Sequence, residues 1–76
     1  MKEKKPCLIV TFHTTAAAMA MEKRCNAAGI GGRLLPVPRE LSSDCGIAWS
    51  SDPADRAEIE RIAASVQYDR IAELLL

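Results

Sequence analysis

Aromatic residues and histidine are scarce in this sequence of 76 residues, and cysteine is confined to three positions. It holds one Trp, one Tyr, one Phe, one His and three Cys. Zinc and similar metals are bound by clustered His and Cys ligands. Cys7, His13, Cys25 and Cys45 include no pair at the spacing that such a cluster needs. We therefore expect no metal site and no bound cofactor.

The sequence also lacks an excess of charge of either sign and any long apolar run. Ten Lys and Arg residues balance ten Asp and Glu residues, so no basic patch of the kind that binds nucleic acid is expected. No segment approaches the roughly 20 apolar residues of a membrane-spanning helix. A signal peptide cleaved near Ala20 is rejected, because cleavage would remove a strand and half a helix from a small core. We expect a cytoplasmic protein with reduced cysteines and without a membrane or nucleic-acid partner.

Residues 1–76 are predicted to form a single domain. Of these residues, 49% are hydrophobic and 26% are charged, which is typical of a folded globular protein. A core of this size is small relative to its surface, so burying further apolar area would stabilise it. We therefore expect self-association as a homodimer, through the apolar residues 74–76 or through an exposed sheet edge.

The first half of the chain predicts a strand followed by a helix. Residues 6–12 form an apolar run that is too short for a helix, which indicates a central strand buried on both faces. Thr14 or Thr15 is suited to cap the next helix, and Gly29 is suited to end it. One face of this helix is predicted to pack in the core through Ala18, Met21, Cys25 and Ala28.

The second half predicts two strands, a helix and a final element. Residues 33–37 form an edge strand, because a proline cannot donate to a ladder, and residues 46–50 form a half-buried strand. Asp52 and Pro53 start a helix with an apolar stripe of Ile59, Ile62, Ala63 and Val66.

Residues 68–76 suit either a strand or a short helix, and we favour a strand because it completes a β-α-β-β-α-β pattern. The predicted fold class is α+β, a two-layer ferredoxin-like sandwich. It has a four-stranded antiparallel sheet with both helices on one face.

The most unusual segment, residues 36–49, holds two prolines, a cysteine, a glycine and the only tryptophan. The prolines stiffen the chain as it leaves a strand, and the polar residues that follow favour a turn that leads to Cys45. Gly46 has no side chain, so a partner or an incoming sulfur atom could approach the thiol closely. From these residues alone, Cys45 is either a small apolar residue at a strand start or a functional thiol.

One set of residues in this segment forms a motif, namely Pro36, Pro38, Arg39, Glu40, Ser42, Ser43, Cys45 and Gly46. The motif resembles the signature of the selenium/sulfur carrier-like proteins, a bacterial and archaeal family first catalogued as a domain of unknown function. The strand at residues 8–12, the Ala-rich helix with Glu22 and the Gly-rich turn before Arg33 are also similar to that family. The resemblance therefore covers nearly the whole chain.

The resemblance implies that Cys45 is a carrier thiol, which holds a persulfide or selenopersulfide and passes it between proteins of sulfur relay or selenium metabolism. A cysteine desulfurase is an expected partner. Whether the protein is an enzyme stays open, and a carrier is favoured over an autonomous enzyme. The candidate site contains Cys45, Gly46 and Arg39, with a binding loop that contains Pro36, Pro38, Ser42 and Ser43.

Two questions stay open at this point. Arg39 would favour the thiolate of Cys45 if the loop folds back, whereas Asp44 would disfavour it. The alternative function is a non-catalytic adaptor module in which the loop from Pro36 to Trp49, including Trp49 itself, forms the binding surface. We expect Cys7 and Cys25 to be shielded, so that Cys45 is the reactive thiol.

Overall fold

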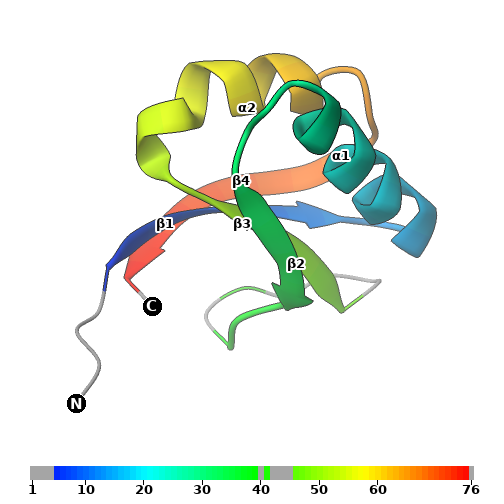
Figure 1. Cartoon of the computed structure of the whole chain (residues 1–76). Helices are drawn as coiled ribbons and strands as arrows, with labels where there is room; N and C mark the ends of the chain where they lie inside the picture. The colour runs from blue at the N-terminus through cyan, green and yellow to red at the C-terminus, as the bar shows by residue number, and fades with distance from the viewer. Residues whose placement is uncertain (1–4, 40, 42–45, 76) are drawn as a thin grey trace.

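Two helices lie on one face of a four-stranded antiparallel sheet (Figure 1). The computed structural model of the chain describes residues 5–39, 41 and 46–75. In chain order the elements are β1 (Pro6–Phe12), α1 (Thr15–Ala27), β2 (Gly32–Pro36), β3 (Ile47–Ser51), the 3₁₀ helix η1 (Pro53–Asp55), α2 (Arg56–Ala63) and β4 (Tyr68–Leu75). The strand order in the sheet is β2-β3-β1-β4. The predicted α+β two-layer sandwich is confirmed, and the tail is a strand.

Strand β1 lies in the interior of the sheet, between β3 and β4. Its residues from Leu8 to Phe12 are fully buried, so the predicted burial on both faces is confirmed. Leu8, Val10 and Phe12 point to the helices and join the main core, whereas Ile9 and Thr11 point to the other face because side chains alternate along a strand.

Strand β3 differs from its prediction in one respect. Both Ala48 and Trp49 are fully buried, although they lie on opposite faces of the sheet. The expected half-buried pattern is therefore wrong in the middle of this strand. On the face away from the helices, the centre of the sheet is also inaccessible to solvent, because the paired residues Ala48 and Thr11 are both fully buried.

Helix α1 packs on the sheet through Ala18, Met21 and Cys25, which are fully buried. Ala28, the fourth residue predicted on this face, is exposed because it lies beyond the last residue of the helix, at its C-terminal cap. Gly29 follows with a φ of 76°, a conformation that favours glycine. The predicted end of the helix at this glycine is confirmed.

Trp49 is the largest fully buried side chain. It belongs to the core cluster that also contains Ile59 and Ala63 of α2. A Cβ atom at Gly32 would lie 2.6 Å from Cζ2 of the indole ring, so the close approach of β2 to this ring requires a glycine. Because Trp49 is enclosed, it is not part of an adaptor surface, and this part of the alternative function is wrong.

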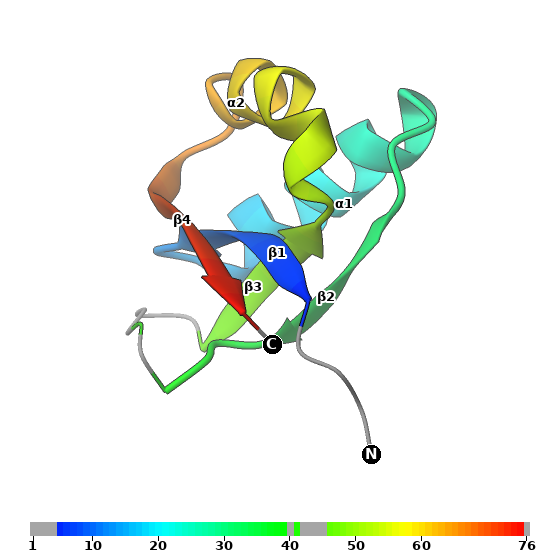
Figure 2. The ribbon, with the colours of Figure 1, turned by 90° about the vertical axis from the view of Figure 1, so that its left-hand side faces the viewer.

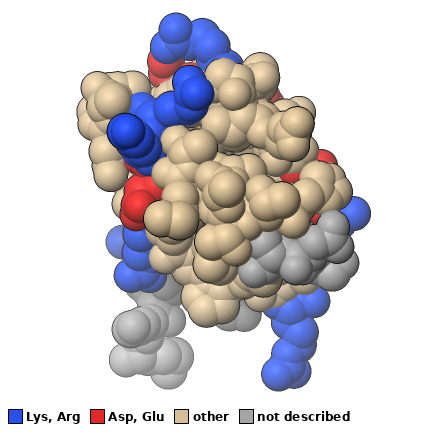
Figure 3. Space-filling view, turned by 90° about the vertical axis from the view of Figure 1, so that its right-hand side faces the viewer, with Lys and Arg blue, Asp and Glu red and all other residues tan. Residues whose placement is uncertain are grey.

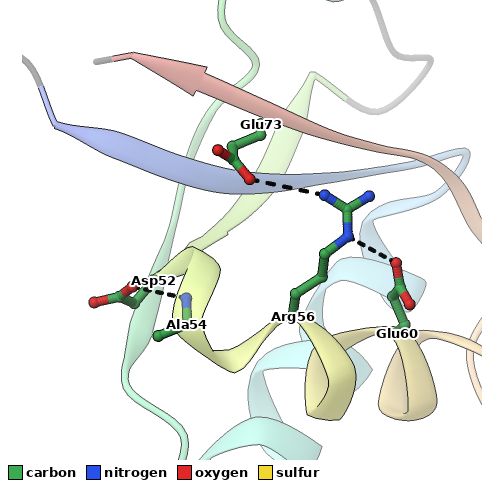
Figure 4. Close-up of polar contacts among 5 residues, drawn as sticks. All are labelled: Asp52, Ala54, Arg56, Glu60 and Glu73. Atoms are coloured by element: carbon green, nitrogen blue, oxygen red, sulfur yellow. Dashed lines mark hydrogen bonds and ion pairs between the residues drawn. The ribbon is translucent and has the colours of Figure 1, made fainter.

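Both helical segments begin with the predicted capping side chains. The backbone N–H of Ala17 donates to Oγ1 of Thr14 over 3.1 Å, which caps α1. The backbone N–H of Ala54 donates to Oδ1 of Asp52 over 2.9 Å, and Pro53 follows as the first residue of η1 (Figure 4). These bonds satisfy backbone donors that have no partner within the helix.

Arg56 connects the start of α2 to β4. Its Nε donates to Oε2 of Glu60 over 2.9 Å, and its Nη1 lies 3.8 Å from Oε1 of Glu73 (Figure 4). All three side chains are about half exposed, so the contacts orient the helix and contribute little free energy. Within the described residues, no helix is long and apolar enough to cross a membrane.

Candidate functional site

The loop between β2 and β3 is closed at its base by a backbone hydrogen bond. The N–H of Val37 donates to the carbonyl oxygen of Gly46 over 3.0 Å, directly beyond the last strand pair, Pro36 and Ile47. In Figures 1 and 2 the described residues of the loop lie below the sheet, on the side away from the helices. This base fixes the points at which the chain leaves and re-enters the sheet.

The predicted site residues divide into two groups. Among the described ones, Pro36, Arg39 and Gly46 are exposed and Pro38 is half-buried. Gly46 has a φ of 73°, which a residue with a side chain adopts only with strain. The others, Ser42, Ser43 and Cys45, lie outside the described residues, and their assignment stays a prediction.

An open apolar depression lies at the base of the loop. It has a volume of about 280 Å³ and is lined by Leu34, Leu35, Pro36, Gly46 and Ile47. Gly46, which is bonded covalently to Cys45, contributes to this lining. An apolar hollow beside the loop is suited to receive one side chain of a docking protein.

Three chain segments meet at the end of the sheet that carries this loop. The register pairs Thr11 with Ala48, Pro36 with Ile47, and Phe12 with Tyr68. The turn from β1 to α1, the loop from β2 to β3 and the start of β4 therefore lie at the same end. We call it the loop end.

Figure 3 views the side of the molecule on the right of Figure 1, where uncharged residues cover the middle of the face.

A β-bulge in β4 places an acidic side chain at the loop end. The register between β1 and β4 shifts where Thr11 pairs with Arg70 and Phe12 pairs with Tyr68, which leaves Asp69 as the extra residue. An extra residue of this kind redirects a side chain. The hydroxyl of Thr11 donates to Oδ2 of Asp69 over 3.3 Å, and Nε2 of His13 lies 3.4 Å from Oδ1.

The cluster of Thr11, Asp69 and His13 extends from the buried hydroxyl of Thr11 to the solvent-accessible imidazole of His13. Thr11 is fully buried, whereas 29% of the Asp69 side chain and 56% of the His13 side chain are exposed. The sequence analysis considered His13 only as a possible metal ligand and did not single out Asp69, because a bulge leaves no signal in the pattern of residues. Within the described part of the chain, no group of three or more His, Cys, Asp or Glu residues is placed to hold a metal ion.

The two described cysteines differ from each other. Cys25 is fully buried, and burial raises the pKa of its thiol, so it stays protonated and inert as expected. Cys7 is only half-buried, and its thiol donates to the carbonyl oxygen of Lys5 over 3.5 Å. The prediction that both thiols are shielded is therefore wrong for Cys7.

Cys7 lies at the other end of the sheet, which we call the far end. There it lines an open pocket of about 620 Å³ together with Lys5, Arg33, Ser50 and Asp52, among others. The pairing of Leu8 with Ser51 and of Thr11 with Ala48 shows that β1 runs from the far end to the loop end. Cys7 and the loop are thus separated by the length of a strand.

Residues 7–73 match the model of one protein family, described as "Putative Se/S carrier protein-like". The chain belongs to this family. The matched range includes both helices, the loop and nearly all of the sheet, in agreement with the resemblance carried by the motif. No curated protein and no solved structure matches the chain.

Proposed function

We propose that the protein carries a sulfur or selenium atom on Cys45, as a persulfide or selenopersulfide, and passes it from one partner protein to another. The observation that carries this proposal is the family match over residues 7–73, which contains the motif around Cys45. A carrier needs a thiol that reacts with two proteins in turn, and a short loop on a rigid scaffold meets this need better than a deep pocket.

The contrast with Cys25 supports the choice of Cys45. A thiolate is the form that attacks a sulfur donor, and the fully buried Cys25 is held in the neutral form. Cys45 instead follows a polar segment and precedes Gly46, an exposed glycine whose positive φ turns the chain into β3. Arg39, which is also exposed, supplies a positive charge to the same loop.

The apolar depression at the base of the loop supports docking of the partner proteins. A partner side chain in the hollow of Leu34, Leu35, Pro36, Gly46 and Ile47 would bring the partner's surface beside the loop. The partners we propose are a cysteine desulfurase or other proteins of sulfur relay and selenium metabolism. An adaptor function without transfer would use the same hollow, so the two functions differ in whether Cys45 becomes modified.

The test is transfer of sulfur to the intact protein. The protein is incubated with a cysteine desulfurase and cysteine, and mass spectrometry then measures the mass of each cysteine-containing peptide. We expect one added sulfur atom on the peptide with Cys45. Cys45→Ser should abolish the modification, whereas Cys7→Ser and Cys25→Ala should leave it unchanged.

Selenocysteine replaces cysteine as the substrate of the desulfurase in a second arm, which separates a sulfur carrier from a selenium carrier. If Cys45 stays unmodified with several desulfurases and with either cysteine or selenocysteine as the substrate, while the protein binds a desulfurase through the loop, the carrier function is wrong. The adaptor function then takes its place.

We also propose self-association through β4, which forms one edge of the sheet. Leu75 and Tyr68 of this strand are exposed to 61% and 42%, and an uncovered edge strand favours pairing with a second copy. Sedimentation of a dimer at high micromolar concentration, lost in Leu75→Lys, is the expected result. A monomer at every concentration would exclude it.

A further inference from the structure

We infer that a second copy of the chain pairs with β4 in one antiparallel register, centred on Ala72, so that the two sheets join into one. The inference rests on the self-association proposed above, and it adds which residues of the two copies face each other. Three observations carry it: the backbone groups at the outer edge of β4, the two exposed apolar side chains at its ends and the positions of its acidic residues.

The edge formed by β2 is poorly suited to pair with another strand. The N–H of Val37 donates to the carbonyl oxygen of Gly46, directly beyond the last strand pair of β2 and β3. Backbone groups alternate in direction along a strand, so the residues of β2 that point these groups outward are Gly32, Leu34 and Pro36. Pro36 has no N–H to donate, and a proline in this place protects an edge strand from pairing.

The edge formed by β4 has no such protection. When the same alternation is followed across β3 and β1 to β4, the residues that point their backbone groups outward are Ile71, Glu73 and Leu75. Each of them has both a donor and an acceptor. The strand is eight residues long and contains no proline or glycine, and within the described residues no strand pairs with its outer side. Such an edge is a template for another strand.

The ends of β4 carry apolar side chains that match each other in two antiparallel copies. Among the described residues the exposed large apolar side chains are Met19, Tyr68 and Leu75, and two of these three lie at the ends of β4. Tyr68 pairs with Phe12, which points to the helices. Leu75 points to the same face, because it pairs with Pro6 and side chains alternate along β1. An antiparallel second copy therefore brings Tyr68 of each chain to Leu75 of the other, which favours self-pairing over an unrelated strand.

The acidic residues of β4 select one register. Outward residues must face outward residues, so the two-fold axes that keep most of the strand paired lie beside Ile71, Ala72 or Glu73. An axis at Glu73 sets two glutamates opposite each other, and an axis at Ile71 sets Glu73 opposite the bulge that contains Asp69. Like charges that face each other are destabilising. The axis at Ala72 avoids both contacts, and it also aligns the two exposed apolar side chains.

This pairing leaves the loops of both copies accessible. β4 begins at the loop end and runs to the far end, so an antiparallel neighbour places its far end beside the loop end of the first copy. The two-fold axis is perpendicular to the joined sheet, so the helices of both copies lie on the same face. The bases of the two loops between β2 and β3 therefore lie at opposite ends of the dimer, where each can meet a partner protein.

The test is a disulfide across the proposed axis. Ala72→Cys is made in the full chain together with Cys7→Ser and Cys45→Ser, and the fully buried Cys25 is kept. The Cα atoms of two residues that face each other at such a position are about 4.5 Å apart, a separation that a disulfide spans. Mild oxidation with oxidised glutathione should convert most of the protein to a covalent dimer, as seen on a gel run without reductant.

Matched variants in the same background locate the axis. Arg70→Cys and Leu74→Cys should give no covalent dimer alone but a heterodimer when they are mixed, because Arg70 faces Leu74 of the second copy in the proposed register. Ile71→Cys and Glu73→Cys should also give none. A covalent dimer from either of these two variants, in place of Ala72→Cys, would put the axis elsewhere and overturn the inference.

The contact at the strand ends is tested without added cysteines. Tyr68→Glu and Leu75→Lys should each raise the Kd of the dimer by about tenfold, as measured by sedimentation. An equimolar mixture should regain the dimer, because the introduced carboxylate and ammonium face each other. Met19→Lys replaces the third exposed apolar side chain and is the matched control, which should leave the Kd unchanged. Equal Kd values for the mixture and for the separate variants would contradict the contact.

The outcomes separate this pairing from the proposals that precede it. A dimer in sedimentation that Ala72→Cys fails to cross-link would overturn the pairing and leave self-association in place. A monomer in both measurements would reject self-association and the pairing together. Neither measurement depends on sulfur transfer, so a failure of the carrier function would not alter either result.

Discussion

The loop end and the far end of the sheet use their polar side chains differently. At the far end these side chains form hydrogen bonds with backbone groups. The hydroxyl of Ser51 donates to the carbonyl oxygen of Gly31 over 2.6 Å, and Asp52 caps η1. At the loop end, Asp69 contacts Thr11 and His13 through side chains and closes neither a helix nor a turn. Thr14 caps α1 at the loop end as well, so the two ends differ only in this additional cluster of Asp69, Thr11 and His13.

The largest loss of stability is expected in the core that joins the two ends. Trp49→Ala removes the largest fully buried side chain, and such truncations cost about 3 to 5 kcal/mol. The free energy of unfolding of a domain of this size is about 4 to 11 kcal/mol, so we expect the variant to lose a large part of its stability and to unfold at a much lower urea concentration. Urea denaturation followed by circular dichroism measures the change. A loss below about 1 kcal/mol would contradict the enclosed position of Trp49.

A smaller loss is expected at the far end, at Gly32. In Gly32→Ala the new Cβ would lie 2.5 Å from the carbonyl oxygen of Ser50 and 2.6 Å from the Trp49 ring. Overpacking of this kind costs about 1 to 3 kcal/mol. Gly31→Ala is the matched control, because a Cβ there meets nothing within 4 Å. Equal unfolding midpoints for the two variants would show that β2 does not depend on this close approach.

The cap of the second helical segment should contribute less. Asp52→Ala removes the acceptor for the Ala54 N–H, and the loss of such a cap costs about 1 kcal/mol. Asp52→Asn keeps an acceptor oxygen and should recover most of the loss. The alkylation rate of Cys45 should be the same in both variants, because Asp52 lies at the far end. A changed rate would weaken the separation of the two ends.

The smallest effect is a dependence of stability on pH that comes from Cys25. Burial raises the pKa of this thiol above its ordinary value of 9.0. Above that pH the unfolded state loses the proton while the folded state keeps it, so the free energy of unfolding should fall as the pH rises. Below pH 9.0 the contribution is complete. Cys25→Ala should lack this component of the slope in denaturation measured from pH 8 to 11, and an unchanged slope would argue against it.

Most of the fold follows from patterns that depend on neighbouring residues. Each of these patterns involves residues that are close together in the sequence, and all were predicted correctly. They are the apolar run of β1, the cap at Thr14, the glycine at residue 29 and the helix start at Asp52. The strand preference for residues 68–76 depended on completing a known pattern, and β4 confirms it.

The features that the sequence did not reveal depend on distant residues. The burial of Trp49 results from packing against Gly32 and the helices, and a lone tryptophan near a loop carries no sign of it. The half-exposure of Cys7 results from the open pocket at the far end. The bulge at Asp69 depends on the register between the first and last strands, which no local pattern encodes.

The central claim is that the reactive thiol belongs to the loop end, and differential alkylation of the native protein tests it most directly. The folded protein is treated briefly with a light isotopic form of an alkylating reagent, then denatured and treated with the heavy form. The account predicts light label on Cys45, heavy label on the buried Cys25 and a mixture on the half-buried Cys7. Heavy label on Cys45, with light label on Cys7, would contradict it.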